Sequence, residues 1–482
     1  MGSQTTHSLV FCISVVAVLM LQCLLMGSSV APDHDNYHLI PVENFKWKDP
    51  QGFAKCPASS AGQEALKPGV KIRLDHIHGA CSPLRPINSS SWIDLVSQSF
   101  ERDNARLNTI RSKNSGPYTT MSNLPLQSGT TVGTGNYIVT AGFGTPAKNS
   151  LLIIDTGSDL TWIQCKPCAD CYSQVDAIFE PKQSSSYKTL PCLSATCTEL
   201  ITSESNPTPC LLGGCVYEIN YGDGSSSQGD FSQETLTLGS DSFQNFAFGC
   251  GHTNTGLFKG SSGLLGLGQN SLSFPSQSKS KYGGQFAYCL PDFGSSTSTG
   301  SFSVGKGSIP ASAVFTPLVS NFMYPTFYFV GLNGISVGGD RLSIPPAVLG
   351  RGSTIVDSGT VITRLLPQAY NALKTSFRSK TRDLPSAKPF SILDTCYDLS
   401  RHSQVRIPTI TFHFQNNADV AVSDVGILVP VQNGGSQVCL AFASASQMDG
   451  FNIIGNFQQQ RMRVAFDTGA GRIGFASGSC AA

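Results

Sequence analysis

Short apolar runs separated by Gly-, Ser- and Thr-rich connections recur along most of the chain. Residues 135–140 alternate like an opening strand, and residues 144–146 predict the turn that closes its hairpin. Residues 302–304 and 327–330 read as strands on either side of a division near residues 306–326. The pattern is typical of a mostly β protein whose core divides into two parts.

Two segments show helical spacing instead. In residues 91–113, a start resembling a capping box is followed by apolar residues that recur on roughly one face, which predicts an amphipathic helix. A second helix is predicted from Pro367, with an apolar face and basic residues toward its C-terminal end. The first face comprises Trp92, Leu95, Val96, Phe100, Leu107 and Ile110, and the second comprises Tyr370, Leu373 and Phe377.

Two β-branched apolar runs end in nearly the same way. Residues 152–158 deliver Asp155 followed by Thr-Gly-Ser, and residues 354–360 deliver Asp357 followed by Ser-Gly-Thr. A strand that ends in a tight glycine turn holds its carboxylate in one place, with hydroxyls beside it as donors. The repetition predicts two similar lobes that bring the two carboxylates together, where they would share one proton.

Each aspartate is followed by a run of apolar residues and glycines. Residues 263–268 and residues 452–456 predict strands that cross beneath the two turns, with glycine where backbones approach closely. Residues 219–225 contain Asp-Gly between extended segments, which predicts a hairpin in the first lobe. No comparable hairpin follows Asp357.

These motifs, in this order over residues 135–476, resemble the pepsin-like aspartic proteases, and in particular their nepenthesin-like plant branch. The resemblance implies a bilobal, mostly β fold and an aspartic endopeptidase in which Asp155 and Asp357 activate one water. Ser158 and Thr360 would hold the outer carboxylate oxygens, and Thr156 and Ser358 would brace the turns around Gly157 and Gly359. In the flap, Tyr221, Gly222 and Asp223 would cover the substrate, with the Tyr221 phenol reaching the Trp162 indole.

The same resemblance implies a polypeptide substrate, bound extended, and an acid pH optimum. Apolar residues near the dyad (Tyr221, Trp162 and Ile163) favour cleavage between bulky hydrophobic residues. Basic side chains would be accepted only where Asp159 or Asp223 reaches them. No cofactor and no metal are expected, and the chain is expected to be a monomer.

The N-terminal region divides into a predicted signal peptide over residues 1–29 and a predicted propeptide over residues 30–128. Residues 9–26 are almost continuously apolar, and the alternative is a signal anchor. Residues 46–113 carry 11 Lys/Arg against 6 Asp/Glu, which favours a separately folded basic segment whose cations occupy the carboxylate site. A plain N-terminal extension is the alternative. Asn88 begins a glycosylation sequon in this region.

The 16 cysteines favour disulfides in an oxidising compartment. Cys165, Cys168 and Cys171 imitate a metal-binding spacing, but neither a fourth cysteine nor a histidine follows closely enough to complete a site. Spacing leaves the connectivity open. The family resemblance implies Cys165–Cys168, Cys171–Cys250, Cys192–Cys215, Cys197–Cys210, Cys289–Cys480 and Cys396–Cys439.

The remaining composition narrows the possible functions. Only 13% of the 482 residues are charged and the net charge is +1, and no basic run indicates nucleic-acid binding. The first lobe is expected over residues 129–305, an inter-lobe connection over 306–326 and the second lobe over 327–482. The apoplast or the vacuole is expected, with no membrane association after signal cleavage. Three alternatives stay open: a catalytically weak inhibitor or binding protein, a DNA-associated plastid protease, and a wall protein with incidental proteolysis.

Overall fold

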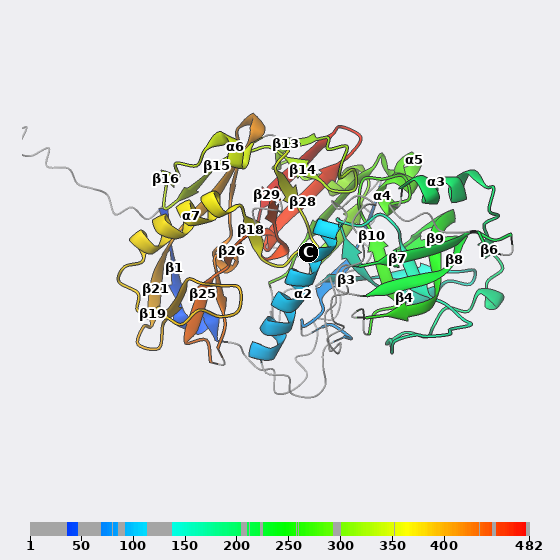
Figure 1. Ribbon diagram of the computed structural model, residues 1–482, viewed down its shortest axis with the longest axis horizontal. Helices are drawn as coiled ribbons and strands as arrows, with labels where there is room; N and C mark the ends of the chain where they lie inside the picture. Colours follow the sequence, from blue (N-terminus) through cyan, green and yellow to red (C-terminus); the bar gives the residue numbers. More distant parts are fainter. Residues whose placement is uncertain are drawn as a thin grey trace, which may run out of the picture.

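A computed structural model describes residues 36–46, 69–79, 81–84, 92–112 and 137–478, with short gaps at 204–209, 212, 222–224, 257, 259, 293–299, 351, 433 and 446–449. The predicted signal peptide, Asn88, Cys56 and Cys480 lie outside the described residues. Most elements are strands, arranged as two lobes with one long helix between them (Figure 1). The predicted mostly β, bilobal architecture is confirmed.

The first lobe is built on hairpins. The predicted opening hairpin is formed by antiparallel strands β3 and β4, and a longer hairpin is formed by β8 and β9. The strands of this lobe are β3 (Tyr137–Phe143), β4 (Lys148–Asp155), β5 (Trp162–Gln164), β6 (Lys188–Thr189), β7 (Val216–Asn220), β8 (Ser226–Leu238), β9 (Asp241–Thr255) and β10 (Gly263–Gly266). Its helices are α3 (Ala195–Ser203), α4 (Phe274–Gln277) and α5 (Lys279–Tyr282).

The second lobe carries two four-stranded sheets and the predicted helix α7 (Pro367–Lys380), whose Tyr370, Leu373 and Phe377 are buried. One sheet comprises β15 (Leu332–Val337), β16 (Asp340–Arg341), β22 (Ile410–Phe414) and β23 (Ala418–Ala421). The other comprises β19 (Ser386–Ala387), β20 (Cys396–Asp398), β24 (Leu428–Pro430) and β25 (Gln437–Leu440). The strands that surround Asp357 in this lobe are β14 (Phe329–Val330), β17 (Thr354–Val356), β18 (Thr363–Leu365), β26 (Phe442–Ser444) and β27 (Asn452–Ile454). The short helix α6 (Pro346–Leu349) also belongs to the second lobe.

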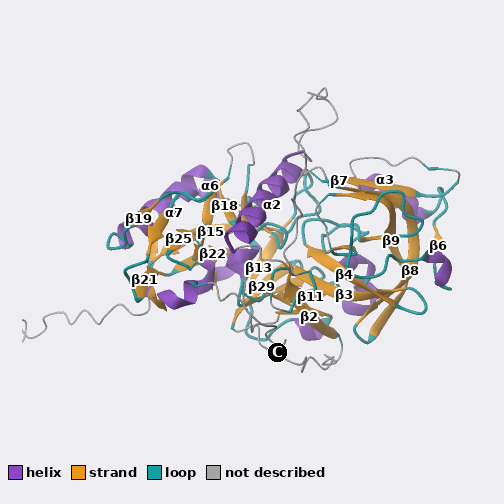
Figure 2. Cartoon of the chain, turned by 90° about the horizontal axis from the view of Figure 1, so that it is seen from below, coloured by secondary structure: helices purple, strands orange, loops and turns teal. Residues whose placement is uncertain are grey.

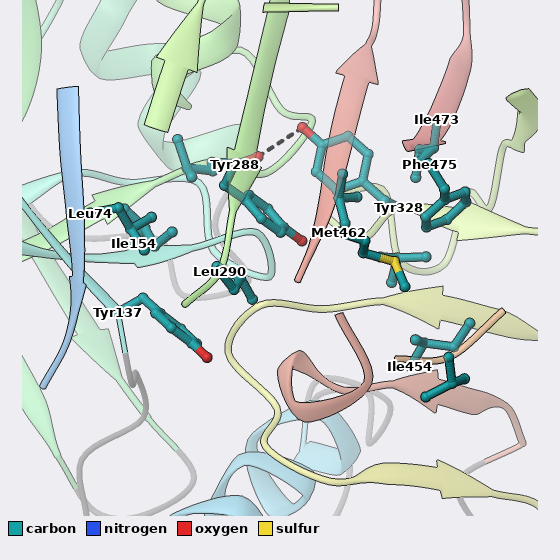
Figure 3. Packing of buried hydrophobic residues seen from close by; sticks show 14 of the residues in the cluster. Leu74, Tyr137, Ile154, Tyr288, Leu290, Tyr328, Ile454, Met462, Ile473 and Phe475 are labelled. Carbon is teal, nitrogen blue, oxygen red and sulfur yellow. Dashed lines mark hydrogen bonds between the residues drawn. The ribbon is translucent and has the colours of Figure 1, made fainter. Parts of the chain in front are cut away.

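Strands from both lobes meet in one sheet beneath the site. Strand β28 (Met462–Asp467) pairs with β11 (Gln285–Cys289) and with β29 (Arg472–Ser477), and β11 pairs with β12 (Gly300–Val304). The predicted connection 306–326 contains a further strand of this sheet, β13 (Val314–Val319), which pairs with β29. Tyr288, Tyr328 and Met462 belong to one buried cluster that spans the two lobes (Figure 3).

The N-terminal segment is not separately folded, contrary to the prediction. Strand β1 (Tyr37–Pro41) pairs with β21 (Gln404–Pro408) of the second lobe. Strand β2 (Val70–His76) lies between β12 and β3 and pairs with both, so that Leu74 is fully buried in the shared core. Isolated strands leave backbone groups unpaired, and the segment satisfies them by joining sheets of the main body.

The long helix α2 (Trp92–Ser112) matches the predicted amphipathic helix to within one residue at each end. It lies between the lobes in both views (Figures 1 and 2). Val96 and Phe100 pack in a cluster with second-lobe residues, and Leu107 packs in another with Phe327 and Phe329. The apolar side chains of Val96, Phe100 and Leu107 on α2 are therefore covered mainly by the second lobe.

The disulfide connectivity corrects four of the predicted pairs. The bonds are Cys165–Cys250, Cys168–Cys171, Cys192–Cys210, Cys197–Cys215 and Cys396–Cys439, of which only the last was predicted. The parallel pairing of β5 with β9 sets Ile163 opposite Cys250 and brings the Cα atoms of Cys165 and Cys250 to 5.3 Å. Cys289 is also disulfide-bonded.

Candidate active site

Matching strands deliver the two aspartates. Asp155 is the last residue of β4, and Asp357 directly follows β17. Strand β10 runs parallel to β4, with Gly266 opposite Asp155, and β27 runs parallel to β17. The two apolar–glycine runs therefore lie beside the aspartate strands, as the sequence predicts.

Glycine is required where the backbones cross. A Cβ atom on Gly266 would lie 2.1 Å from the Asp159 carbonyl oxygen, and one on Gly455 would lie 2.5 Å from the Val361 carbonyl oxygen. Such separations are too short for any side chain. The two glycines allow each crossing strand to support its own turn.

In each turn a glycine N–H holds one oxygen of the carboxylate. The Gly157 N–H donates to Asp155 Oδ1 at 2.9 Å, and the Gly359 N–H donates to Asp357 Oδ1 at 3.0 Å. Thr360 Oγ1 donates to Asp357 Oδ2 at 2.7 Å, as predicted. Both aspartates are fully buried.

Thr156 and Ser358 join the two turns. The Thr156 N–H donates to Ser358 Oγ at 3.1 Å, and the Ser358 N–H donates to Thr156 Oγ1 at 2.9 Å. This reciprocal pair is the bracing that the sequence predicts. It couples the positions of the two lobes at the point where the carboxylates meet.

The cation between the carboxylates comes from α2. Arg106 Nη1 and Nη2 donate to Asp155 at 2.9 and 2.7 Å, and Nε and Nη2 donate to Asp357 at 3.2 and 3.1 Å. Arg106 is only 2% exposed. A guanidinium presents several N–H donors in one plane, which suits two carboxylates at once.

Arg106 also explains why Ser158 does not hold the outer oxygen of Asp155, although the sequence predicted that it would. The Ser158 hydroxyl makes no hydrogen bond within the described part of the chain. The outer oxygen of Asp155, Oδ2, accepts from Arg106 Nη1 instead. The two turns are therefore symmetric in sequence but not in their hydrogen bonds.

The electrostatics follow from burial and from this cation. Burial raises the pKa of the Asp357 carboxyl, but Arg106, Thr360 and the Gly359 N–H together lower it more, so that it lies below its ordinary value. Burial alone would lower the pKa of Arg106, and the two carboxylates raise it well above its ordinary value. Arg106 is therefore charged at every pH that the protein meets.

A second ion pair lies one helical turn away. Arg364 of β18 donates from Nη2 and Nε to Asp103 Oδ2 at 2.8 and 3.1 Å, and Asp103 is fully buried. Sequence reasoning expected a cation in the site without identifying Arg106, and it missed Asp103 and Arg364. Arg364 stands seven residues after Asp357, as Trp162 stands seven residues after Asp155, and this repeated spacing was the available signal.

The flap contact is present. Trp162 Nε1 donates to Tyr221 Oη at 2.9 Å, and both side chains are buried against the Phe258 ring. Gly222 and Asp223, predicted to belong to the flap, lie outside the described residues. Tyr221 thus lies in the predicted position, hydrogen-bonded to the indole.

Tyr221→Phe is expected to lower the free energy of unfolding by about 1–2 kcal/mol, because the buried Trp162 N–H loses its acceptor. Urea unfolding measures the loss. In a cycle with Trp162→Phe, the double variant should lose less than the sum of the two single variants. Strict additivity would show that the bond contributes nothing.

Two residues expected beside the substrate are used internally. The Asp159 carboxylate is buried and accepts hydrogen bonds from Thr326 Oγ1 at 2.6 Å and from Asn270 Nδ2 at 2.8 Å. Ile163 is fully buried in the shared core. Asp159 therefore serves to hold the inter-lobe segment, and the expectation that it binds a basic substrate side chain is corrected.

Two β lobes that each deliver a buried aspartate from a braced glycine turn define the bilobal acid-protease class. Two family models match the lobes: one described as "Xylanase inhibitor N-terminal" over residues 137–306, and one as "Xylanase inhibitor C-terminal" over residues 327–477. Aspartyl protease family protein 2 of Arabidopsis thaliana is 40% identical over 456 residues, which is 92% of this chain and 91% of that protein. Aspartic proteinase nepenthesin-1 of Nepenthes gracilis is 37% identical over 430 residues, which is 87% of this chain and 92% of that protein.

Solved structures agree on the fold. Soybean basic 7S globulin matches with a TM-score of 0.57 and 20% identity, covering 72% of this chain and 94% of that chain. Lupine conglutin gamma matches with a TM-score of 0.56 and 22% identity, covering 71% of this chain and 92% of that chain. The two family models and the sequence relatives show that the chain belongs to the pepsin-like aspartic protease family, and they confirm its resemblance to the nepenthesins.

Proposed function

We propose that the protein is an aspartic endopeptidase that hydrolyses polypeptides with one water held between Asp155 and Asp357. The observation that carries the proposal is the pair of buried carboxylates in matching, mutually braced turns. Once the Arg106 cation no longer lies between them, two neighbouring carboxyl groups cannot both ionise readily, so one acts as base while the other acts as acid.

In the proposed reaction, the ionised carboxylate takes a proton from the water as the water attacks the scissile carbonyl. The protonated carboxyl donates its proton to the carbonyl oxygen, which gives a neutral gem-diol without a covalent intermediate. The Gly157 and Gly359 N–H groups would hold the inner oxygens throughout. Tyr221 would close over the substrate and order it for attack.

We further propose that the chain is made as an inactive precursor in which α2 blocks the dyad. Arg106 fills the position between the carboxylates that the water and the substrate carbonyl would need. Cleavage within or after the predicted propeptide, residues 30–128, would release α2 and the Asn88 sequon with it. Hydrophobic residues at the scissile bond remain the expected substrate.

The test of the function is hydrolysis of an unfolded polypeptide by the matured chain at acid pH, with inhibition by a statine-type transition-state analogue. An inhibitor or binding protein is the second candidate, favoured only by the descriptions of the two family models. Such a protein would have no need of two braced aspartates. Within the described part of the chain, none of the helices could span a membrane. From the predicted signal peptide and the disulfides we propose secretion to the apoplast or delivery to the vacuole.

Acid is expected to release the block. A carboxyl whose folded pKa is depressed stabilises the folded state above its ordinary pKa, about 3.9 for Asp, and this contribution is lost as pH falls through the folded value. Asp357 is such a group, so its contact with Arg106 is complete at neutral pH and weakens below about pH 4. Asp103 contributes to the pH dependence with the opposite sign, because burial raises the pKa of its carboxyl despite the nearby Arg364. The loss of stability in acid therefore rests on Asp357.

The purified precursor should therefore be latent at pH 7 and should gain activity after incubation near pH 3. Activity assays and N-terminal sequencing of the products measure the conversion. A parallel incubation with a statine-type inhibitor separates self-processing from cleavage by a contaminant. Equal latency after incubation at pH 3 and at pH 7 would contradict the acid-release mechanism.

A further inference from the structure

Arg364 occupies a position in the second lobe that matches Trp162 in the first. Each residue lies seven positions after its lobe's aspartate, on the strand that follows the glycine turn. Trp162 serves the flap through Tyr221. Arg364 places a cation at the corresponding position, and nothing in the dyad chemistry requires it.

Every side-chain hydrogen bond that Arg364 makes with the described residues goes to α2. Its Nη2 and Nε donate to Asp103, and Nη2 also donates to Asn104 Oδ1 at 3.0 Å. The strand neighbours of Arg364 are apolar: Ala443 on β26 and Ile453 on β27. Among the described residues, Asp103 is the titratable group that accepts hydrogen bonds from the Arg364 guanidinium.

The Asp103 carboxylate sits in a built receptor. Besides the Arg364 fork, the Val361 N–H donates to its other oxygen, Oδ1, at 2.6 Å. A planar guanidinium and a backbone N–H that both donate to the same side chain are a specific match for a carboxylate. When α2 leaves, both sets of donors lose their acceptor and become available to another carboxylate.

The receptor lies close to the reacting atoms. Asp103 and Arg106 are three residues apart on one helix, which is about 4.5 Å along its axis. An extended peptide rises about 3.3 Å per residue. A substrate side chain in place of Asp103 would therefore belong to a residue about one or two positions from the scissile bond.

We propose that in the matured protease Arg364, with the Val361 N–H, binds an Asp or Glu side chain of the substrate one or two residues from the scissile bond. This inference rests on the proposed proteolytic function and makes Arg364 a specificity-determining residue. In the precursor, Asp103 occupies the site as an internal substitute for that acidic side chain. Hydrophobic residues at the scissile bond are compatible with it.

The test uses matured protein and a set of peptides with one hydrophobic scissile pair. The peptides differ only in whether Asp or Asn stands at one of the two positions on either side of that scissile pair. At pH 5.5 the peptide whose Asp reaches Arg364 should have a kcat/KM about tenfold or more above that of the peptide with Asn at the same position. Arg364→Gln should bring the ratio of the two kcat/KM values to about one.

A pH series separates binding from a merely structural role. A guanidinium is charged throughout this pH range, whereas a free substrate carboxyl has an ordinary pKa of about 3.9. The Asp/Asn ratio of the wild type should therefore fall toward one near pH 3, a change that needs no variant and is unaffected if Arg364→Gln folds poorly. Arg364→Lys should keep a reduced preference.

The outcomes are distinct. Equal Asp/Asn ratios in wild type and Arg364→Gln, or a wild-type ratio of one at pH 5.5, would overturn the acidic-subsite inference while leaving the protease intact. Cleavage of none of the peptides, or of any unfolded polypeptide, would overturn the proposed function itself.

Discussion

Asp155→Asn and Asp357→Asn, each made alone, are expected to reduce hydrolysis by the matured protein to near background, a loss of about 10³-fold or more in kcat. The reason is that the proposed reaction needs one proton shared by two carboxyl groups. An amide can neither take the proton from the water nor return it to the carbonyl oxygen. Steady-state hydrolysis of an unfolded polypeptide measures the loss.

The experiment needs two safeguards. Because self-processing should fail in these variants, the full chain is matured with a trace of active wild-type protein before assay. Asp170→Asn is the matched control, because Asp170 is exposed in the first lobe and its substitution should leave turnover unchanged. Full activity in either dyad variant would rule out the proposed mechanism.

Arg106→Gln is expected to destroy the latency of the precursor. The wild-type guanidinium pairs with two fully buried carboxylates, and removing one partner of such a group typically costs about 3–5 kcal/mol. Most of that cost can be relieved if α2 leaves the site and the dyad becomes hydrated. The variant precursor should therefore bind a statine-type inhibitor and hydrolyse peptides at pH 5, where the wild-type precursor does neither.

The neighbouring Glu101→Gln serves as the control, since Glu101 is exposed on the same helix and its loss should leave latency intact. Limited proteolysis within α2 reports the release independently of activity. A variant precursor that stays latent, with the wild-type free energy of unfolding, would show that Arg106 does not hold the block.

Features encoded in short stretches were predictable. Strand-plus-glycine turns carry their own backbone chemistry, so the turns at Asp155 and Asp357, the mutual bracing of Thr156 and Ser358, and the contact of Thr360 with its carboxylate were correctly predicted. The apolar period of α2 predicted its ends to within one residue. The prediction that Ser158 binds the outer oxygen of Asp155 was wrong, because Arg106, 52 positions earlier in the chain, donates to that oxygen instead.

By itself, then, the sequence determined the mostly β class, the paired aspartates and the helix in the N-terminal region, because each depends on local periodicity or on turn chemistry. The order of its motifs also carried the resemblance to the family. Only the tertiary structure decided that Arg106 is the cation of the site, that Asp103 meets Arg364, that β2 lies inside the shared sheet and that Cys165 pairs with Cys250. These contacts join residues from 49 to more than 200 positions apart. Their partners are chosen by the packing of whole lobes and by the cost of leaving a buried charge or backbone group unpaired, and no local pattern in the chain records that choice.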